Sequence, residues 1–183
     1  APDRKAHGSG GVLADIGIHL LDFASMPLGT LASVHCRLKC FEKDEGSEVE
    51  GYTLDANDSA VITAEFTNGA LGTLHTSRWA YPNQNSLQLY LYGSRASIEI
   101  DLNASQNQLK INRVLDRKDT GWETLECGTA PTLHERFVRS IRTGKPEQPT
   151  FARGAEIQHV LDACLRSAEE DRTIRIHPTD HES

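Results

Sequence analysis

The stretch SAVITAEFTNGALGTLHTSRW, residues 59–79, decides the fold class of this chain. Apolar and polar side chains alternate before and after its centre, and this period of two is typical of half-buried β-strands. Between the two runs stands Asn68-Gly69, a pair that tolerates the positive backbone angles of a tight hairpin turn. The stretch therefore predicts an antiparallel β-hairpin.

More strands are expected on both sides of this hairpin. Residues 87–92 place three leucines on one face and Gln88, Tyr90 and Tyr92 on the other. The remaining predicted strands are SVHCRLKCF (33–41), RASIEIDL (95–102), QLKINRV (108–114), WETLEC (122–127) and, as a short edge strand, TIRIH (173–177). The segments DEGSEVEGYTLDAND (44–58) and NASQNQ (103–108) are interpreted as polar turns.

Three helices flank the strands. The first, residues 11–25, carries an apolar stripe and is expected to stop near Pro27 and Gly29. The other two cover residues 131–144 and 153–171. Strands grouped together with helices outside them predict an α+β fold, an open, mostly antiparallel (mixed) β-sheet with helices packed on one face. Since there is no repeat and no linker, all 183 residues are expected to form one domain.

Composition narrows the class of partner. The chain has 26 acidic and 19 basic residues, and its formal net charge of -7 opposes binding to nucleic acid or to an anionic membrane. No apolar run approaches the roughly 20 residues of a membrane span, and the N-terminal residues do not resemble a signal peptide. We therefore expect a cytoplasmic protein whose partner is a small polar or neutral molecule.

The four cysteines, at positions 36, 40, 127 and 164, do not have the spacing of a metal site or of a disulfide scaffold. Cys36 and Cys40 fall on the same face of a predicted strand as Val34 and Leu38. Because a free cysteine behaves as a small buried hydrophobe, these side chains are expected in the core.

The first predicted helix carries a line of polar side chains, Asp15, His19 and Asp22, spaced by four and three residues. Three interpretations remain open from spacing alone. The residues can be a satisfied polar group without chemistry, or they can ligate a metal, although no third strong ligand is apparent. They can also perform acid/base catalysis, because an imidazole exchanges protons near neutral pH and an adjacent carboxylate orients it.

Four segments in order resemble one known family. They are GGVLADIGIHLLDFA (10–24), DSAVITAEFTNGALGTLHTSRWA (58–80), NSLQLYLYGSRASIEIDL (85–102), and the closing run FVRSIRTGKPEQPTFARGAEIQHVLDACLRSAEEDRTIRI (137–176). The first resembles G-G-G-x-L-x-D-x-G-x-H-x-x-D, and the second D-S-x-x-x-x-x-x-F-x-N-G-A-x-G-x-x-x-x-S-R. The third resembles N-x-L-x-L-x-x-x-G-x-x-A-x-x-x-D, and in the last two helices flank a Pro-x-F-x-x-Gly turn. Together they resemble the glucose-fructose oxidoreductase / inositol dehydrogenase (Gfo/Idh/MocA) family over nearly the whole chain.

The resemblance implies a division of labour between two domains. Family members have an N-terminal Rossmann domain that binds NAD or NADP, followed by a C-terminal α/β domain for substrate contacts and oligomerisation. This chain resembles the second domain alone, without the G-x-G-x-x-G fingerprint and without the Glu-Lys-Pro motif that carries the family's catalytic lysine. By itself it is expected to be inactive. The implied reaction is hydride transfer at a secondary alcohol or carbonyl of a sugar, inositol or related polyol.

The resemblance also assigns roles by position. His19 matches the family's acid/base histidine, and Asp15 matches the carboxylate that helps to place the substrate hydroxyl. Asp22 is interpreted as structural, as a cap or a helix-to-sheet contact. Gly10 and Gly11 are expected close to the cofactor, the substrate or a neighbouring strand, since a glycine lets the backbone approach closely.

Weaker substrate-binding candidates are Arg78, Trp79, Tyr81 and Asn85, because a guanidinium and aromatic faces suit a polyol. The open sheet face is expected to mediate a homodimer or homotetramer. A second hypothesis stays open, in which the protein is a noncatalytic, cofactor-sensing regulator that works through that sheet surface. The presence of both Asp15 and His19 favours the enzyme.

Overall fold

The predicted hairpin is present in the structure, which is a computed structural model. β4 (Ser59–Phe66) and β5 (Leu71–Ser77) pair antiparallel, and Gly69 at the turn has a φ of 85°. The structure describes residues 10–41, 48–49, 52–53, 55–83, 85–115 and 118–177. The chain divides into two units, one formed by residues up to Ala80 together with those from Pro149 onward, the other by residues 81–148.

The first unit contains a four-stranded antiparallel sheet in the order β10-β1-β4-β5. β1 (Leu31–Lys39) lies beside β4, and β10 (Ile174–Arg175) pairs with the outer side of β1. This pairing confirms the edge strand predicted near the end of the chain. Every strand pair in the described part is antiparallel.

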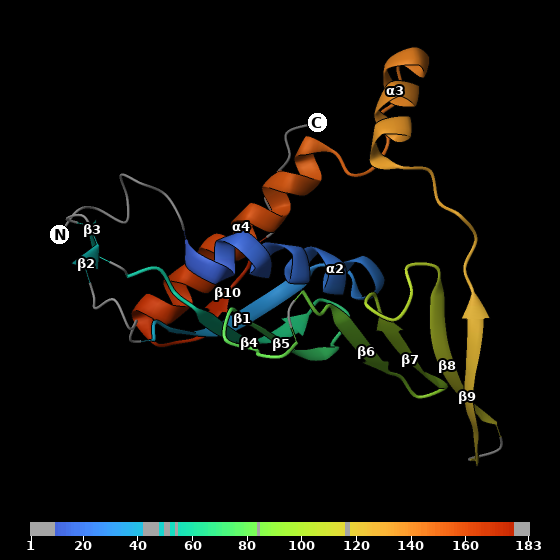
Figure 1. Cartoon of the computed structure of the whole chain (residues 1–183), viewed down its shortest axis with the longest axis horizontal. Helices are drawn as coiled ribbons and strands as arrows, with labels where there is room; N and C mark the ends of the chain where they lie inside the picture. Colours follow the sequence, from blue (N-terminus) through green and yellow to red (C-terminus); the bar gives the residue numbers. More distant parts are fainter. Residues whose placement is uncertain are drawn as a thin grey trace. The chain divides into compact units, whose positions relative to one another are not determined.

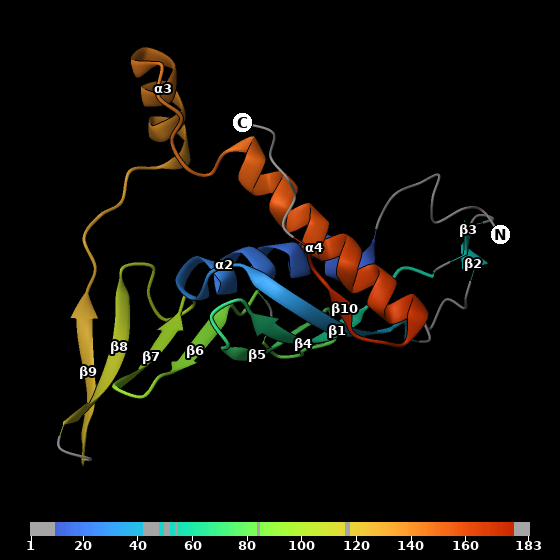
Figure 2. The same ribbon diagram turned by 180° about the vertical axis from the view of Figure 1, so that it is seen from behind.

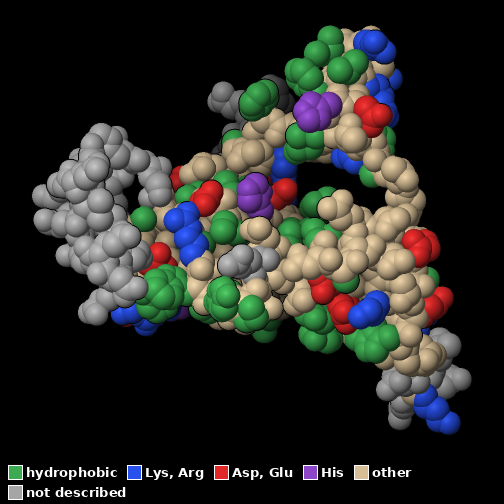
Figure 3. Space-filling model, viewed as in Figure 1, with side chains coloured by type: hydrophobic (Ala, Val, Ile, Leu, Met, Phe, Trp, Pro, Cys, Tyr) green, Lys and Arg blue, Asp and Glu red, His purple; other side chains and the backbone are tan. Residues whose placement is uncertain are grey.

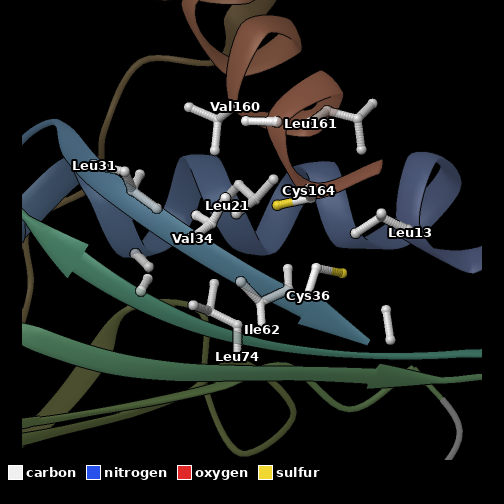
Figure 4. Packing of buried hydrophobic residues seen from close by; sticks show 14 of the residues in the cluster. Leu13, Leu21, Leu31, Val34, Cys36, Ile62, Leu74, Val160, Leu161 and Cys164 are labelled. Carbon is white, nitrogen blue, oxygen red and sulfur yellow. The ribbon is translucent and has the colours of Figure 1, made fainter. Parts of the chain in front are cut away.

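Two helices cover one face of this sheet. The first helical segment begins as η1 (Leu13–Gly17) and continues as α2 (Ile18–Leu28), and the second is α4 (Phe151–Glu170). Both lie on the same side of the strands in Figure 1 and in the reverse view of Figure 2. Inward-facing residues of α2, α4 and the strands interlock in one core, drawn in Figure 4. The α+β class, with helices on one sheet face, is confirmed.

The buried side chains show which sheet face the helices cover. On β4 the side chains alternate strictly, so that Ala60, Ile62, Ala64 and Phe66 are buried while the residues between them are exposed. Burying apolar surface of this kind is the main favourable term in folding, at roughly 25 cal/mol per Å². Because the side chains alternate, one face of β4 packs against the helices and the other face is exposed to solvent.

One cysteine prediction is wrong. Cys36 is buried on β1 against Cys164 of α4, but Cys40 lies beyond the end of β1 and is exposed. Its thiol is within 3.3 Å of the backbone oxygen of Ala56. The strand ends at Lys39, so the period of two no longer applies at position 40.

The second unit contains a four-stranded antiparallel meander in the order β6-β7-β8-β9. Its strands are β6 (Gln88–Tyr92), β7 (Ala96–Asp101), β8 (Gln108–Leu115) and β9 (Lys118–Glu126). The last two strands are longer than the sequence pattern indicated. Leu89 pairs with Ile100 and Leu91 with Ile98, which places the apolar side chains of β6 and β7 on one face. The eight strands named so far thus form two four-stranded sheets.

Helix α3 (Leu133–Thr143) belongs to the second unit and begins with a capping box between Thr132 and Glu135. It ends at Gly144, where the φ of 66° suits glycine, so the predicted stop is confirmed, whereas the helix begins two residues later than predicted. None of its residues is buried. Its apolar residues, of which Phe137 is 64% exposed, gather on the surface of the helix in Figure 3.

The segment predicted as a polar turn at residues 44–58 has more structure than expected. It contains a two-stranded sheet of β2 (Glu48–Val49) and β3 (Tyr52–Thr53), and its last two residues, Asn57 and Asp58, are buried. Residues 1–9 and 178–183 lie outside the described residues. Among the described helices, none has the length and apolar character that a bilayer crossing requires.

Candidate active site

The helix that carries Asp15 and His19 is not the regular helix that the sequence predicted. Residues Leu13–Gly17 form a π-helix, and the α-helix that follows runs on to Leu28, beyond the predicted end and through Pro27. Asp15 therefore lies on the π-helical segment and His19 on the α-helical one. Single-turn π segments inside helices are rare and occur frequently at functional sites.

Asp15 and His19 are both exposed, one turn apart along this helix. The carboxylate of Asp15 accepts a hydrogen bond from the guanidinium of Arg78, with 2.7 Å between Oδ2 and NH2. In the described part of the chain, no hydrogen bond joins Asp15 to His19. The imidazole of His19 thus faces solvent beside a carboxylate that an arginine already orients.

Arg78 reaches Asp15 from the end of β5. It follows the last strand residue, Ser77, and its backbone N–H donates to the carbonyl oxygen of Asp58 at 2.9 Å. Arg78 and Asp15 are 63 residues apart in sequence. The structure therefore brings together two residues that the sequence proposed separately, one as a substrate ligand and one as the partner of the histidine.

The other weak candidates are placed as follows. Trp79 is 56% exposed and contacts Phe41 edge-on, with 5.7 Å between ring centroids. Tyr81 is 84% exposed, and Asn85 is exposed with a φ of 55°, a left-handed conformation that asparagine tolerates. Tyr81 and Asn85 belong to the second unit, whereas Trp79 belongs to the first.

Close packing within the chain accounts for Gly10 and Gly11. A Cβ at Gly10 would lie 2.6 Å from the Cβ of Ala14, and a Cβ at Gly11 would lie 2.4 Å from Nδ2 of Asn57. Gly11 also has a φ of 65°, a backbone angle that residues other than glycine rarely adopt. Gly11 therefore approaches the segment containing Asn57, whereas Gly10 packs against Ala14. Their predicted nearness to a cofactor stays a prediction.

Asp22 does not take part in the candidate site with Asp15, because its side chain contacts α4. Its carboxylate accepts a hydrogen bond from Nε of Arg153 at 2.9 Å, and the same guanidinium donates to the hydroxyl of Ser25 at 2.5 Å. Asp22 is thus structural, as expected, but it joins helix α2 to helix α4 rather than capping a helix or contacting the sheet.

Two residues at this site were missed by the sequence analysis. Asn57 stood in a presumed polar turn, and nothing in its local pattern distinguishes it from a solvated loop residue. Arg153 lies inside the Pro-x-F-x-x-Gly turn that begins α4, so that motif was the available signal. In the described ranges, no cluster of three or more His, Cys, Asp or Glu side chains could hold a metal ion.

The comparisons with known proteins show which family this chain is similar to. The sequence model of the oxidoreductase family, C-terminal alpha/beta domain (Gfo/Idh/MocA), matches residues 3–176. The chain belongs to this family. Its resemblance to the family's second domain is therefore confirmed.

Three relatives describe how far the likeness extends. Levoglucosan dehydrogenase from Pseudarthrobacter phenanthrenivorans is 22% identical over 210 residues, which cover 94% of this chain and 53% of that protein. The crystal structure of an oxidoreductase domain protein from Kribbella flavida matches with a TM-score of 0.77 and 25% identity, covering 96% of this chain and 54% of that one. A levoglucosan dehydrogenase in complex with NADH and levoglucosan matches with a TM-score of 0.80 and 22% identity, covering 92% and 51%. This chain thus spans about half the length of the relatives it matches.

Proposed function

We propose that this chain is the substrate-binding and oligomerisation half of an NAD(P)-dependent oxidoreductase that acts on a secondary hydroxyl or carbonyl of a sugar, inositol or related polyol. The observation that carries the proposal is the exposed His19 one helical turn from the Asp15–Arg78 pair. Membership of the oxidoreductase family supports it, as does the relative whose structure contains NADH and levoglucosan.

His19 is the acid/base group in this proposal. In the oxidative direction its imidazole accepts the proton of the substrate hydroxyl while the hydride leaves the same carbon, and in reduction it returns the proton. Asp15, oriented by Arg78, accepts a hydrogen bond from a neighbouring substrate hydroxyl. Arg78 keeps further N–H donors that can bind a second substrate oxygen.

NAD or NADP, when bound, supplies the hydride acceptor or donor. The space around Gly10 and Gly11 is filled by Ala14 and Asn57, and the chain has no dinucleotide fingerprint. The proposal therefore assigns cofactor binding to the other half of the full-length protein, and this chain alone is expected to show no turnover.

The oligomer is proposed to form through the open face of the sheet in the first unit. That face carries exposed apolar side chains, with Leu71 81% and Val61 45% exposed. Apolar surface on a sheet face is typical of protein interfaces. Light scattering of the 183-residue chain tests this point, and a monomer at all concentrations would contradict it.

A test of the catalytic role uses the full-length protein with a panel of sugars and polyols, including levoglucosan, in the presence of NAD or NADP. We expect a change in absorbance of the reduced nicotinamide with at least one substrate. His19→Ala should lower kcat by roughly 100- to 10,000-fold while the affinity for the cofactor is unchanged.

His159→Ala is the matched control, because His159 is also an exposed histidine of the same unit but lies on α4. Equal loss in both variants would contradict the assignment of His19. If the protein binds cofactor but turns over no substrate of the panel, the alternative of a noncatalytic, cofactor-sensing regulator replaces the enzyme.

A further inference from the structure

Asn57 connects the segment containing Gly10 and Gly11 to the rest of the candidate site. Its side chain is 2% exposed, and its Oδ1 accepts a hydrogen bond from the N–H of Leu13 at 3.0 Å. Its Nδ2 donates to the carbonyl oxygen of Gly10 at 2.7 Å, and its backbone oxygen accepts from Val12 at 2.8 Å. Three hydrogen bonds therefore tie one buried residue to the segment that leads into the π-helix.

Asn57 also packs tightly against Gly11, in addition to making these hydrogen bonds. The hypothetical Cβ of Gly11 would lie within 2.5 Å of three atoms of Asn57, so the two residues are in direct contact. The first N–H groups of a helix have no partner within the helix, and here the side chain of Asn57 satisfies one of them. The amide of Asn57 offers its donor and its acceptor on two separate atoms, whereas a hydroxyl offers both on one atom.

The next residue, Asp58, holds the opposite side of the site. Its backbone oxygen accepts the N–H of Arg78 at 2.9 Å, and its backbone N–H donates to Lys39 at 2.8 Å. Its Oδ2 accepts the N–H of Phe41 at 2.9 Å. Two consecutive residues, Asn57 and Asp58, thus hold the backbone on both sides of the Asp15–Arg78 ion pair.

We propose that Asn57 is a positioning residue of the active site, which sets Asp15 at hydrogen-bonding distance from Arg78 by fixing the start of the π-helix. This inference rests on the proposed function only for its consequence in turnover. The positioning itself follows from contacts within the chain.

Asn57→Asp is the sharpest variant, because it keeps the shape of the side chain and the acceptor for Leu13. It replaces the donor to Gly10 by an oxygen, which faces the carbonyl oxygen of Gly10 and repels it. The start of the helix should therefore move away from Asn57. If this variant does not fold, Asn57→Ser serves in its place, since a hydroxyl does not reach both partners.

Asn68→Asp is the matched control. Asn68 donates from Nδ2 to the carbonyl oxygen of Leu28 at 3.0 Å, so it contacts the other end of the same helical segment. Its Oδ1 accepts from Ala70, also at 3.0 Å. The two variants make the same chemical change, and only Asn57 contacts the segment that leads into the π-helix with Asp15.

The first measurement is made on the 183-residue chain by nuclear magnetic resonance. We expect the guanidinium signals of Arg78 to shift and the amide hydrogen of Leu13 to exchange faster in Asn57→Asp, and both to stay unchanged in Asn68→Asp. Unchanged Arg78 signals in a folded Asn57→Asp chain would overturn the positioning role.

The second measurement is turnover by the full-length protein. Asn57→Asp should lower kcat roughly 10- to 100-fold, because small displacements of catalytic groups are costly. It should also raise KM, because Asp15 and Arg78 bind the substrate in the proposed function, while cofactor affinity changes little. An equal fall in kcat for Asn68→Asp would overturn the proposal. If the wild-type protein turns over no substrate, the proposed function fails, and the resonance measurement still decides the role of Asn57.

Discussion

Arg153 of α4 and Asp22 of α2 form an ion pair, with 2.9 Å between Nε and Oδ1 across 131 residues of sequence. The same guanidinium also contacts Ser25 and, on its own helix, Glu156. The segment that carries Asp15 and His19 is therefore attached near both ends, by Asn57 at its start and by Arg153 toward its end. The exposed face of this segment carries the candidate site residues Asp15 and His19.

Loss of this ion pair should weaken the first unit. Arg153→Met is expected to lower the free energy of unfolding by about 1–2 kcal/mol, because hydrogen bonds to charged groups are lost while Asp22 remains partly exposed. Urea denaturation measures this change. Arg166→Met is the control, since Arg166 forms an exposed i,i+4 pair with Glu170 on the same helix and should change stability by less than about 0.5 kcal/mol. Equal effects of the two variants would contradict a structural role for the pair.

Gly11 and Gly154 should respond to alanine in opposite directions. Gly11→Ala is expected to destabilise the chain by about 2 kcal/mol or more, since the residue has a positive φ and the new Cβ would overlap Asn57. Gly154→Ala is expected to stabilise it by about 0.5–1 kcal/mol, because this position is helical, with nothing within 4 Å of the new Cβ. Thermal unfolding of both variants checks the contrast, and a neutral Gly11→Ala would show that the start of the helix is looser than described.

The four cysteines should separate into two reactive and two unreactive thiols. Cys40 and Cys127 are exposed, whereas Cys36 and Cys164 are fully buried. The hydrogen bond with Cys36, together with burial, raises the pKa of Cys164 and disfavours its thiolate, which is the reactive form. A thiol-disulfide reagent should label two thiols in the native chain and four after denaturation. In the double variant Cys40→Ser/Cys127→Ser, the folded chain should no longer react with the reagent. Fast labelling of a remaining thiol would contradict the burial of Cys36 and Cys164.

The start of helix α3 should depend on pH. Hydrogen bonds from the backbone N–H and the hydroxyl of Thr132 lower the pKa of Glu135 below its ordinary value of 4.5. A carboxyl with a lowered pKa in the folded state stabilises that state above the ordinary pKa, and the contribution disappears as pH falls through the lowered value.

We therefore expect the first turn of α3 to loosen below about pH 4.5. Amide hydrogen exchange measures this loosening. Glu135→Gln is the matched control, because an amide can still accept in the capping box but does not titrate in this range. If the Gln variant shows the same acid loss, the transition arises from another group.

Local chemistry made most of the secondary structure predictable. The hairpin at residues 59–77, its Asn68-Gly69 turn, the edge strand β10 and the end of α3 at Gly144 all follow from side-chain period and turn residues. These features depend on neighbours within a few residues, so the sequence contains their causes directly. The π-helix at Leu13–Gly17 was not predictable in this way, because the same residues also suit an ordinary α-helix.

The sequence by itself determined which residues are candidates for chemistry, since the resemblance of residues 10–24 to a family motif selects Asp15 and His19. Only the tertiary structure decided what orients Asp15 and what holds the helix that carries both residues. Arg78 reaches Asp15 across 63 residues, Asn57 reaches Leu13 across 44, and Arg153 reaches Asp22 across 131. Such contacts depend on how β4, β5 and α4 pack against one helix, and packing between distant segments leaves no periodic signal in a single sequence. The physical reason is that hydrogen-bond partners are set by distance in space, whereas periodicity records only the neighbours along the chain.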